Sequence, residues 1–492
     1  MYPSTYQASI TNLFTHIAYY YLNSYDDVLV DRFTMDNPIS GSLTSLNLRK
    51  FDIVLMSLSY EFDYINAIKI LLLNNIPVVN DRGRRPIIIA GGPAVSANPL
   101  PLSKFFDGIV IGEGEEVLKL LMDSTGLLHS KDLFLENLAS KGLYIPLLHD
   151  GSKIKKSYVV DLDSSYYPEY QIQSLIIEPV FGRGYIMEIS RGCKHLCSFC
   201  MEAFISYPYR VRSYEKIMES VGKGLEVNKV DRVVFYSLSF FDHHSADRIL
   251  ETLLERGIRF SIPSVRADTL NEYRVDLIRR GGQKTLTLAP ETHSDKLRCV
   301  IRKYISDELV SRLIDYGIKL GMEVKLYYMV GIPFEDDEDI NQLVKFLRGL
   351  IPILDKSRFR RRVRVVINPL IPKANTPMQF FGLINKKGYM HRVRLIKKGL
   401  PGRYFRVEAL SHNLAYIQAT MSLGDVKLGD VLLRYVSEAY VNEELHLSSY
   451  KYLLKSLGID TDYVFKPRNP SEILPWEFID LGLNIRGFNI IK

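Results

Sequence analysis

Three of the four cysteines in this 492-residue chain lie within eight consecutive positions. Cys193, Cys197 and Cys200 are separated by three and two residues, so a single loop can present all three thiolates to one group. Clustered cysteines favour a metal site, whereas the disulfides of a secreted protein join cysteines that are spread along the chain. Three thiolates on one loop fit a cubane iron–sulfur cluster whose fourth iron stays open to a substrate or cofactor.

Two simpler interpretations of this motif compete with the cluster. His195, between the first two cysteines, would complete a tetrahedral zinc site with the three thiols. Structural zinc sites commonly use two separated ligand pairs, however, and here all the ligands share one loop. The sequence therefore favours an iron–sulfur cluster over zinc or buried structural cysteines. Cys299 has no neighbouring cysteine, lies in a helical pattern and is expected to be a core thiol.

The cysteine loop comes directly after an apolar run at 185–190, which predicts a buried strand. Five more such runs, spaced by helical stretches, lie at 232–237, 259–265, 284–288, 323–330 and 362–368. This alternation predicts a parallel, barrel-like (β/α) domain. Barrel enzymes carry their active sites at the carboxyl ends of the strands, which is where the cysteine loop lies.

The first part of the chain also alternates strands and helices. Residues 53–58 and 86–90 predict strands on either side of a helix at 64–74. Glycines come after the predicted strands, in Gly91-Gly92-Pro93 and in Gly112-Glu113-Gly114-Glu115, where open parallel sheets bind ligands. A nicotinamide-binding fingerprint is not supported, because the third glycine of that motif is missing.

We therefore expect an α/β protein with three domains. A Rossmann-like domain is predicted over 1–160, a connector over 161–183, the barrel over 184–380 and a small C-terminal α+β module over 381–492. No apolar run approaches the ~20 residues that a bilayer span requires, so no transmembrane segment is expected. No secretory signal is recognisable either, and a cytoplasmic protein is expected.

Basic residues are concentrated in one segment, residues 356–406. The chain has a net charge of +7, and this segment holds 15 Lys and Arg and no Asp or Glu. Such a run either binds a phosphate backbone or is a solvated face, in which Arg360, Arg362 and Arg364 form the outer face of the sixth barrel strand and its entry. Tyr389, Tyr404 and Phe405 interleave with the cations and are candidates for stacking on RNA bases.

The cysteine spacing, with aromatic Phe199 before the last cysteine, resembles the signature of the radical S-adenosylmethionine (SAM) superfamily. Other segments are similar to the group of these enzymes that has an N-terminal cobalamin (B12)-binding domain. The similarity covers most of the chain, in Tyr60–Tyr64, Ala90–Pro93, Asn98–Pro99, Ile111–Glu115, Pro263–Arg266, Leu288–Thr292, Val300–Lys303 and Tyr328–Pro333. The resemblance implies a B12-binding-like Rossmann domain and, after it, a partial (β/α)6 radical SAM barrel.

The resemblance also implies a [4Fe-4S] cluster held by the three cysteines. SAM would chelate the open iron, and an electron from a flavodoxin- or ferredoxin-type donor would break its S–C5′ bond. The products would be methionine and a 5′-deoxyadenosyl radical, which abstracts hydrogen from an unactivated carbon. The chemistry belongs to the cofactor, and the protein supplies orientation and excludes water.

Phe199 and five further residues are expected to bind SAM. Glu291 would accept hydrogen bonds from the ribose or the amino group, and Arg266 and Lys303 would pair with the methionine carboxylate. Gly331 and Ile332 would let the backbone approach adenine. The alternatives are a salt bridge at the barrel rim for Glu291, surface positions for the two cations, and an ordinary strand-to-helix turn for the glycine.

Cobalamin could bind only without a histidine ligand from this chain, because the Asp-x-His-x-x-Gly motif is absent. The alternative is a Rossmann-like domain that only docks a partner or covers the active site. Cys299 is the one cysteine outside the motif, so the second iron–sulfur cluster that a methylthiotransferase needs is not expected. Methylation, rearrangement, carbon–carbon bond formation and simple hydrogen abstraction remain as reaction classes.

Three functions are compatible with these features. The first is an enzyme that modifies RNA bound through residues 356–406. The second is an enzyme that acts on a small molecule or lipid, with the basic segment near anionic head groups. The third is a non-catalytic cobalamin or redox sensor that uses its cluster as a gauge.

Overall fold

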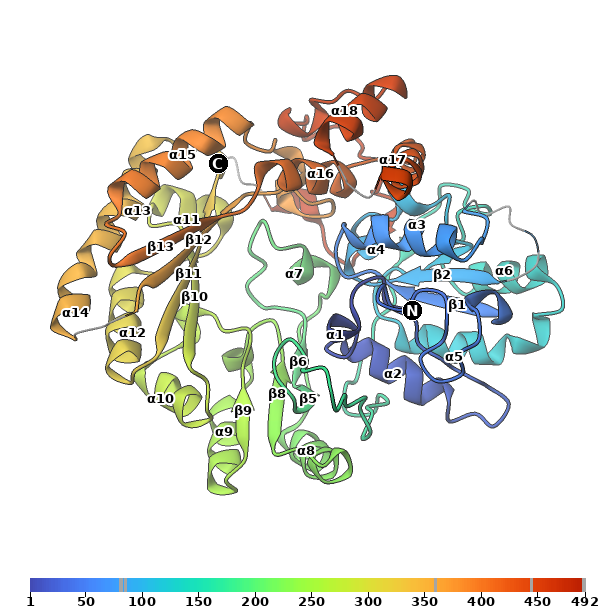
Figure 1. The fold of residues 1–492 in the computed structure, drawn as a ribbon, viewed down its shortest axis with the longest axis horizontal. Coiled ribbons are helices and arrows are strands. Elements are labelled where there is room, and N and C mark those ends of the chain that lie inside the picture. Colours follow the sequence, from blue (N-terminus) through green and yellow to red (C-terminus); the bar gives the residue numbers. More distant parts are fainter. Residues whose placement is uncertain (79–82, 84–85, 358–360, 443–445, 489–492) are drawn as a thin grey trace.

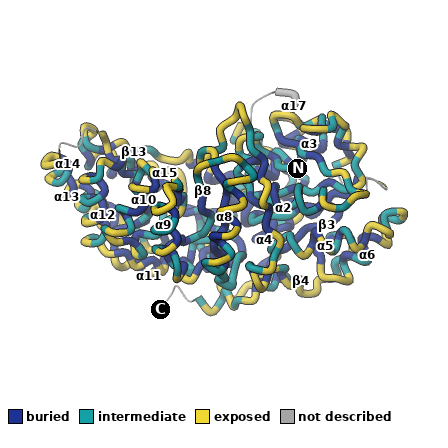
Figure 2. Tube along the Cα trace, turned by 90° about the horizontal axis from the view of Figure 1, so that it is seen from below, coloured by how far each residue is buried: buried dark blue, intermediate teal, exposed yellow. Residues whose placement is uncertain are grey.

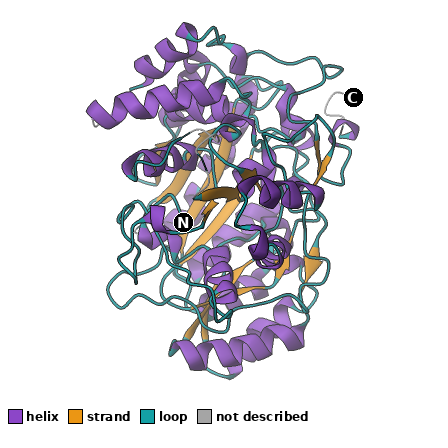
Figure 3. Cartoon of the chain, turned by 90° about the vertical axis from the view of Figure 1, so that its right-hand side faces the viewer, coloured by secondary structure: helices purple, strands orange, loops and turns teal. Residues whose placement is uncertain are grey.

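The computed structural model describes the whole chain apart from residues 79–82, 84–85, 358–360, 443–445 and 489–492. Its strands form two main groups, one in the N-terminal part of the chain and one in the central part (Figure 1). Helices surround the strands (Figure 3), and the buried segments run through the interior of both bodies (Figure 2).

A three-stranded parallel sheet organises the N-terminal body. Its strands pair in the order β1-β2-β3 and are β1 (Ile53–Ser57), β2 (Ile87–Gly91) and β3 (Gly108–Ile109). The helices that come after them are α3 (Asp63–Leu73), α4 (Pro93–Ala97), α5 (Glu115–Asp123) and α6 (Lys131–Ser140). The predicted strand–helix–strand order is confirmed, with each predicted element ending within one residue of the observed one.

Two helices precede this sheet, α1 (Tyr6–Ser9) and α2 (Leu13–Leu22). The side chain of Asn12 caps α2 by accepting a hydrogen bond from the backbone N–H of Thr15 at 2.9 Å. Leu13 and Ile17 of α2 are buried in the same apolar cluster as the strands of the central body. This helix therefore joins the two bodies, and burial of its apolar face stabilises their contact.

In the described part of the chain, seven parallel strands form the partial barrel, in two ladders ordered β5-β8-β9 and β10-β11-β12-β13. The strands are β5 (Tyr185–Glu188), β8 (Arg232–Tyr236), β9 (Arg259–Ser261), β10 (Thr285–Glu291), β11 (Glu323–Val330), β12 (Val363–Pro369) and β13 (Phe405–Ala409). Val233, Leu286 and Leu326 belong to one buried cluster, so a single core joins the ladders. The α/β fold with a partial barrel and its six predicted strands are confirmed.

The barrel helices alternate with the strands as expected. They are α8 (Tyr214–Asn228), α9 (Ala246–Glu255), α10 (Glu272–Arg280), α11 (Asp295–Ile301), α12 (Asp307–Lys319), α13 (Asp337–Gly349), α14 (Ile351–Lys356) and α15 (Lys386–Gly399). Local sequence sets where they begin. The side chain of Asp336 accepts from the backbone N–H of Asp339, and the side chain of Asp339 accepts from that of Asp336, which forms a capping box for α13.

The last part of the chain divides between the two bodies. β13 extends the barrel ladder by pairing with β12, although residues 381–492 were predicted to form a separate module. The helices after it are α16 (His412–Ser422), α17 (Leu428–Asn442) and α18 (Leu447–Ser456). α17 packs on α3, and β14 (Ile479–Asp480) pairs with β4 (Ile154–Lys155). The predicted domain boundaries stay predictions.

No helix in the described residues is long and apolar enough to span a membrane.

Candidate active site

The cysteine motif occupies the loop after the first barrel strand. This loop runs from β6 (Ser190–Arg191) through α7 (Met201–Ile205) to β7 (Arg210–Val211), and β6 and β7 pair antiparallel at its base. Gly192 has a φ of 76°, and a Cβ there would lie 2.6 Å from the carbonyl oxygen of Pro208. Only glycine fits this close approach, so the residue before Cys193 fixes the path of the loop.

The three motif cysteines are free, and none forms a disulfide. Cys193 and Cys197 are buried, and Cys200 is partly buried. Burial raises the pKa of the Cys193 thiol and raises that of Cys200 to about 12. A metal centre that binds these sulfurs must therefore displace their protons.

Arg266 lies directly against the motif, as a predicted site residue should. Its Nη1 is 3.1 Å from Sγ of Cys197, and its Nη2 is 2.7 Å from Oδ2 of Asp268. The guanidinium is thus fixed between a carboxylate and a sulfur, which excludes the alternative of a surface cation. A fixed positive charge at this distance stabilises a thiolate and any further negative charge that gathers on the sulfur ligands.

His195 is engaged away from the thiols. Its Nε2 lies 2.8 Å from Oδ2 of Asp242, and Nζ of Lys194 donates to the carbonyl of Asp242 at 3.1 Å. Among the residues that the structure describes, no three His, Cys, Asp or Glu side chains are gathered closely enough to hold a single metal ion. A cubane does not require such a gathering, because each thiolate binds a different iron. The loop thus fits a cluster better than the zinc alternative.

Glu291 and Lys303 form a buried ion pair. Nζ of Lys303 donates to Oε1 of Glu291 at 2.8 Å, and the two side chains are 9% and 10% exposed. The same Nζ lies 5.8 Å from the ring centre of Phe199. Three predicted site residues are therefore together, and Glu291 forms a salt bridge, as its alternative interpretation expected, with Lys303 as the partner. Glu291, the last residue of β10, has a φ of 70°, a strained conformation that recurs at active sites.

The predicted adenine-contact residues lie beside the same group. Ile332 is buried in an apolar cluster against which Phe199 packs. Gly331 has a φ of 79°, and a Cβ there would lie 2.6 Å from the side chain of Ile384. The glycine thus permits close packing of Ile384. Burial raises the pKa of the Glu335 carboxyl to about 7, although it accepts from the backbone N–H of Gly331 at 3.0 Å and pairs with Arg392.

Two sequence-based predictions were wrong. Cys299 lies in α11 as expected but is exposed, because the helix turns Leu297 and Val300 inward and leaves this position on its outer face. Tyr389 and Phe405 are buried in the barrel core and cannot stack on RNA bases. The Tyr389 hydroxyl donates to the carbonyl of Leu410 at 2.7 Å.

In the rest of the basic segment, some side chains bond carboxylates and others are exposed cations without such a partner among the described residues. Arg358 and Arg360 lie outside the described residues. The Tyr404 hydroxyl donates to Oδ1 of Asp355 at 2.7 Å, and Arg364 pairs with Glu408 at 3.2 Å. One exposed face of α15 carries cations with no carboxylate of a described residue within ion-pair distance, namely Lys386, Lys387, Arg394, Lys397 and Lys398.

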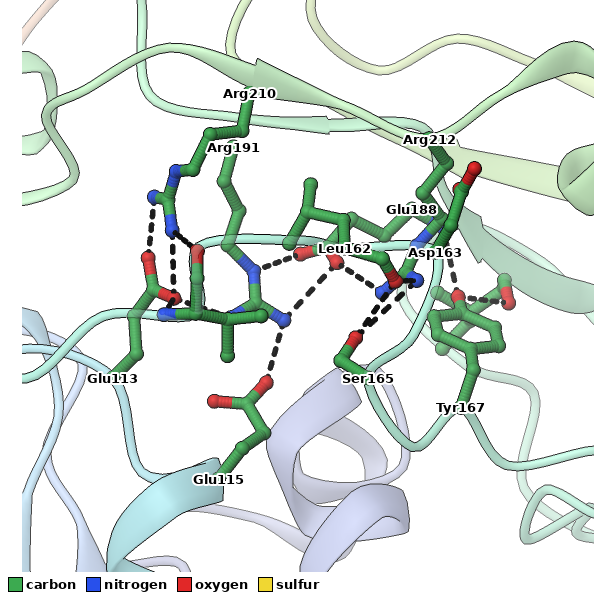
Figure 4. Close-up of polar contacts among 12 residues, drawn as sticks. Glu113, Glu115, Leu162, Asp163, Ser165, Tyr167, Glu188, Arg191, Arg210 and Arg212 are labelled. Carbon is green, nitrogen blue, oxygen red and sulfur yellow. Dashed lines mark hydrogen bonds and ion pairs between the residues drawn. The ribbon is translucent and has the colours of Figure 1, made fainter.

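Sequence reasoning missed a buried charge network that joins the two bodies (Figure 4). Arg191 is 2.8 Å from Oε2 of Glu113, 2.6 Å from Oε1 of Glu115 and 2.8 Å from Oε1 of Glu188. Arg210 pairs with Glu113 at 2.6 Å, and Arg212 pairs with Glu188 at 3.1 Å. Three guanidiniums face three carboxylates, so the charges balance. The only hint of this network in the sequence was the pair Glu113 and Glu115, which come in the glycine-rich turn after a predicted strand.

The electrostatics of the network depend on burial and pairing. Burial alone would raise the pKa of Glu188, but the guanidiniums of Arg191 and Arg212 hold that pKa below its ordinary value. The same opposition lowers the pKa of Glu113, where Arg210 and Arg191 outweigh burial. Arg191 is two residues before Cys193, so the network connects the N-terminal body directly to the cysteine loop.

A cavity of about 930 Å³ lies between the N-terminal body and the mouth of the barrel. Its N-terminal wall comes from α2, the segment 27–33, the whole of β1 and the end of β2. Its barrel wall includes Arg191 and Gly192, next to the cysteine loop. Glu113, Glu115 and Glu188 also line it, so the charge network forms part of its wall. Ligand sites have volumes of about 300 to 1,000 Å³.

Comparisons with known proteins agree with this geometry. The family model "Radical SAM superfamily" matches residues 187–347, and the model "Radical SAM proteins, N-terminal" matches residues 15–146. An uncharacterized protein of Methanocaldococcus jannaschii is 34% identical over 439 residues, which are 88% of this chain and 89% of that protein.

More distant relatives share parts of the chain. A ribosomal protein uS12 methylthiotransferase of Bacteroides thetaiotaomicron is 25% identical over 219 residues, 42% of this chain and 48% of that protein, so the match spans about half of the relative. The structure of the radical SAM methyltransferase TsrM from Kitasatospora setae, with cobalamin and a [4Fe-4S] cluster bound, matches with a TM-score of 0.52 at 12% identity. That match covers 79% of this chain and 89% of the other, and it shows likeness of fold. This chain belongs to the radical SAM superfamily of enzymes.

Proposed function

We propose that Cys193, Cys197 and Cys200 hold one [4Fe-4S] cluster and that the protein uses it to cleave SAM reductively. When bound, the cluster supplies the electron that breaks the S–C5′ bond of SAM and releases a 5′-deoxyadenosyl radical. The observation that carries the proposal is the set of three free thiols on one loop after the first barrel strand, with the guanidinium of Arg266 3.1 Å from Cys197 Sγ.

Arg266 would act on the thiolates and not on the substrate. Its charge, fixed by Asp268, favours negative charge on Cys197 and so eases reduction of whatever the sulfur ligates. From the sequence, this residue was expected to pair with the methionine carboxylate of SAM, because a buried carboxylate needs a cationic partner. The contact with sulfur supports a role in tuning the metal centre.

Glu291 and Lys303 would bind the methionyl part of SAM. A carboxylate and an ammonium 2.8 Å apart are complementary to the amino and carboxylate groups of a zwitterion. Phe199 and Ile332, in the neighbouring apolar cluster, would exclude water from this side of the site. An external one-electron donor of the flavodoxin or ferredoxin type completes the proposal.

A small molecule is the substrate class that the structure supports best, because the cavity opens beside the cysteine loop and has the volume of a small-molecule site. RNA is a second candidate, supported by the unpaired cations of α15 and weakened by the burial of Tyr389 and Phe405. A sensor without catalysis is the third.

Cobalamin is a second candidate occupant of the cavity, and it would make methylation the reaction class. The likeness of fold to a cobalamin-bound methyltransferase supports it. None of the described residues that line the cavity is a histidine, so the cobalt would have no imidazole ligand from this wall. Cobalt content and the visible absorption spectrum after incubation with hydroxocobalamin test this proposal.

Anaerobic reconstitution with iron and sulfide, and then reduction in the presence of SAM, tests the proposed function. We expect about four irons per chain and formation of 5′-deoxyadenosine. Cys193→Ala, Cys197→Ala and Cys200→Ala should each lose the cluster, whereas Cys299→Ala, the matched control on the exposed face of α11, should keep it. Stoichiometric zinc with no bound iron would refute the proposal, and an intact cluster without 5′-deoxyadenosine would favour the sensor.

A further inference from the structure

Arg32 is the half-buried charged residue of the cavity wall that has no ion-pair partner. It lies between α2 and β1, and no carboxylate among the described residues is within ion-pair distance of it. The charges of the network in the wall are satisfied, because Arg191 pairs with Glu113, Glu115 and Glu188.

Other acidic groups near this part of the wall do not neutralise Arg32. The carboxylate of Asp31 accepts hydrogen bonds from the hydroxyl and the backbone N–H of Thr44, at 2.7 and 2.8 Å, and from Leu43. Asp27 and Asp52 also line the cavity, and both are exposed. Arg32 is therefore left with hydrogen-bonding capacity that the protein does not use.

The guanidinium of Arg32 is held in place by aromatic rings. Its Cζ lies 5.2 Å from the ring centre of Tyr19 and 5.8 Å from that of Tyr6. Its Nη1 makes one long hydrogen bond, 3.5 Å, to the Tyr6 hydroxyl, and its Nε is buried and has no hydrogen-bond partner in the protein. A guanidinium offers five N–H donors in a planar fork that matches a carboxylate or phosphate, so most of this fork is unused.

Much of the rest of the wall is apolar. Side chains from α2, from the segment after it and from the barrel contribute, among them Phe14, Ile17, Leu22, Val30, Phe181 and Leu238. Such a wall favours a ligand whose body is apolar, because burying that body releases water from both surfaces. The charges of the network already neutralise one another, so the network does not require a charged group on the ligand.

We infer that this cavity binds a molecule with an apolar body and one anionic group, with the carboxylate or phosphate on Arg32 and the body directed toward the barrel mouth beside Gly192. The inference rests on the proposed function and defines the substrate class of that same site, an amphipathic anion. Arg32 would fix the position of the apolar body relative to the cysteine loop.

Binding of simple probes to the full-length, reconstituted protein tests this inference. Decanoate, decyl phosphate and decanol share an apolar chain and differ in charge, and calorimetry under anaerobic conditions measures their affinities. We expect the two anions to bind at least tenfold more tightly than the alcohol. If both anions meet this expectation, their ratio shows whether carboxylate or phosphate is preferred.

Variants show whether the anions bind at Arg32 in this cavity. Arg32→Gln should reduce the affinity for both anions to that for decanol, and Arg32→Lys should keep part of it. Arg248→Gln is the matched control, because that guanidinium also lies over a tyrosine ring, 3.7 Å from the centre of Tyr214, and does not line the cavity. Ala18→Trp, which fills the cavity, should abolish binding of all three probes. Circular dichroism confirms that each variant is folded.

Two results would overturn the inference. One is equal affinity for decanol and the anions, and the other is unchanged anion binding in Arg32→Gln. Iron content and 5′-deoxyadenosine formation, measured on the same wild-type preparation, test the proposed function separately. A preparation with no bound iron and no 5′-deoxyadenosine would refute the proposed radical chemistry. The probe affinities would still show which class of ligand the cavity binds.

Discussion

Two groups of basic side chains in this protein differ in burial and in pairing: the arginines of the charge network and the cations of α15. The side chains of Arg191, Arg210 and Arg212 are 14%, 8% and 0% exposed, and each guanidinium is bonded to a carboxylate. The cations on the exposed face of α15 have no carboxylate partner among the described residues. The first region joins two bodies of the molecule, and the second faces solvent.

A high density of charged residues in the sequence therefore does not show which charges are buried and need a partner in the structure. A run of cations on a surface needs no partner, because water and salt screen it. A buried guanidinium does need one, and here the partners come from far along the chain: Glu113 lies 78 residues from Arg191 and 97 from Arg210.

The largest effect is expected from breaking the buried network. Glu113→Gln leaves Arg191 and Arg210 facing an uncharged group, and we expect the free energy of unfolding to fall by about 3–5 kcal/mol. Denaturant titration measures it. The control is Asp430→Asn, which removes the exposed pair with Lys104, whose side chains are 47% and 40% exposed, and which should cost about 0–1 kcal/mol. Equal losses in the two variants would show that burial does not separate the two kinds of charge.

The second effect concerns the other buried pair, at the proposed SAM site. Glu291→Gln should weaken SAM binding by about 10- to 100-fold, because a charge-assisted hydrogen bond to the ligand contributes about 1.5–3 kcal/mol. The iron content should not change, since the residue touches no sulfur. Equilibrium dialysis with SAM measures the affinity. A variant that binds SAM as tightly as the wild type would remove Glu291 from the site and make its pair with Lys303 purely structural.

The third prediction concerns how the stability contributed by the buried network depends on pH. The folded-state pKa of Glu188 lies below its ordinary value of 4.5, so its contribution to stability is present above about pH 4.5 and is lost as the pH falls through the lowered pKa. In Glu188→Gln, the free energy of unfolding should therefore change less steeply with pH below 4.5 than in the wild type. Identical slopes would show that Glu188 is not held by Arg191 and Arg212.

The smallest effect on stability is expected on α15. Replacing Lys386, Lys387, Lys397 and Lys398 together by Gln should change the free energy of unfolding by less than about 0.5 kcal/mol per site. The same variant tests RNA as the second substrate class. If RNA binds there, the logarithm of its affinity should fall with the logarithm of salt concentration by ~0.7 per phosphate contact, and the variant should flatten that slope. A flat slope in the wild type would dismiss RNA.

The sequence predicted the elements whose signals are local. Apolar runs and cysteine spacing were enough to predict six barrel strands and the position of the cysteine loop. β13 was missed, although Phe405, Val407 and Ala409 alternate with charged residues as a strand should, because the basic run suggested a separate surface module. The charge network was out of reach, since no local pattern connects Glu113 to Arg191. Cys299 shows that a helical pattern does not by itself say which face is buried.

The contacts between the N-terminal body and the last helices also affect how the protein is made. Nδ2 of Asn98 donates to the carbonyls of Ser422 and Gly424 at 3.0 and 2.8 Å, across separations of 324 and 326 residues. A ribosome adding about 5–20 residues per second takes roughly 16 to 65 seconds to cover that distance. Throughout that interval the apolar side of α3, which α17 covers in the finished protein, has no partner. The N-terminal body is thus the first part to leave the ribosome, and its packing is completed only when the last helices arrive.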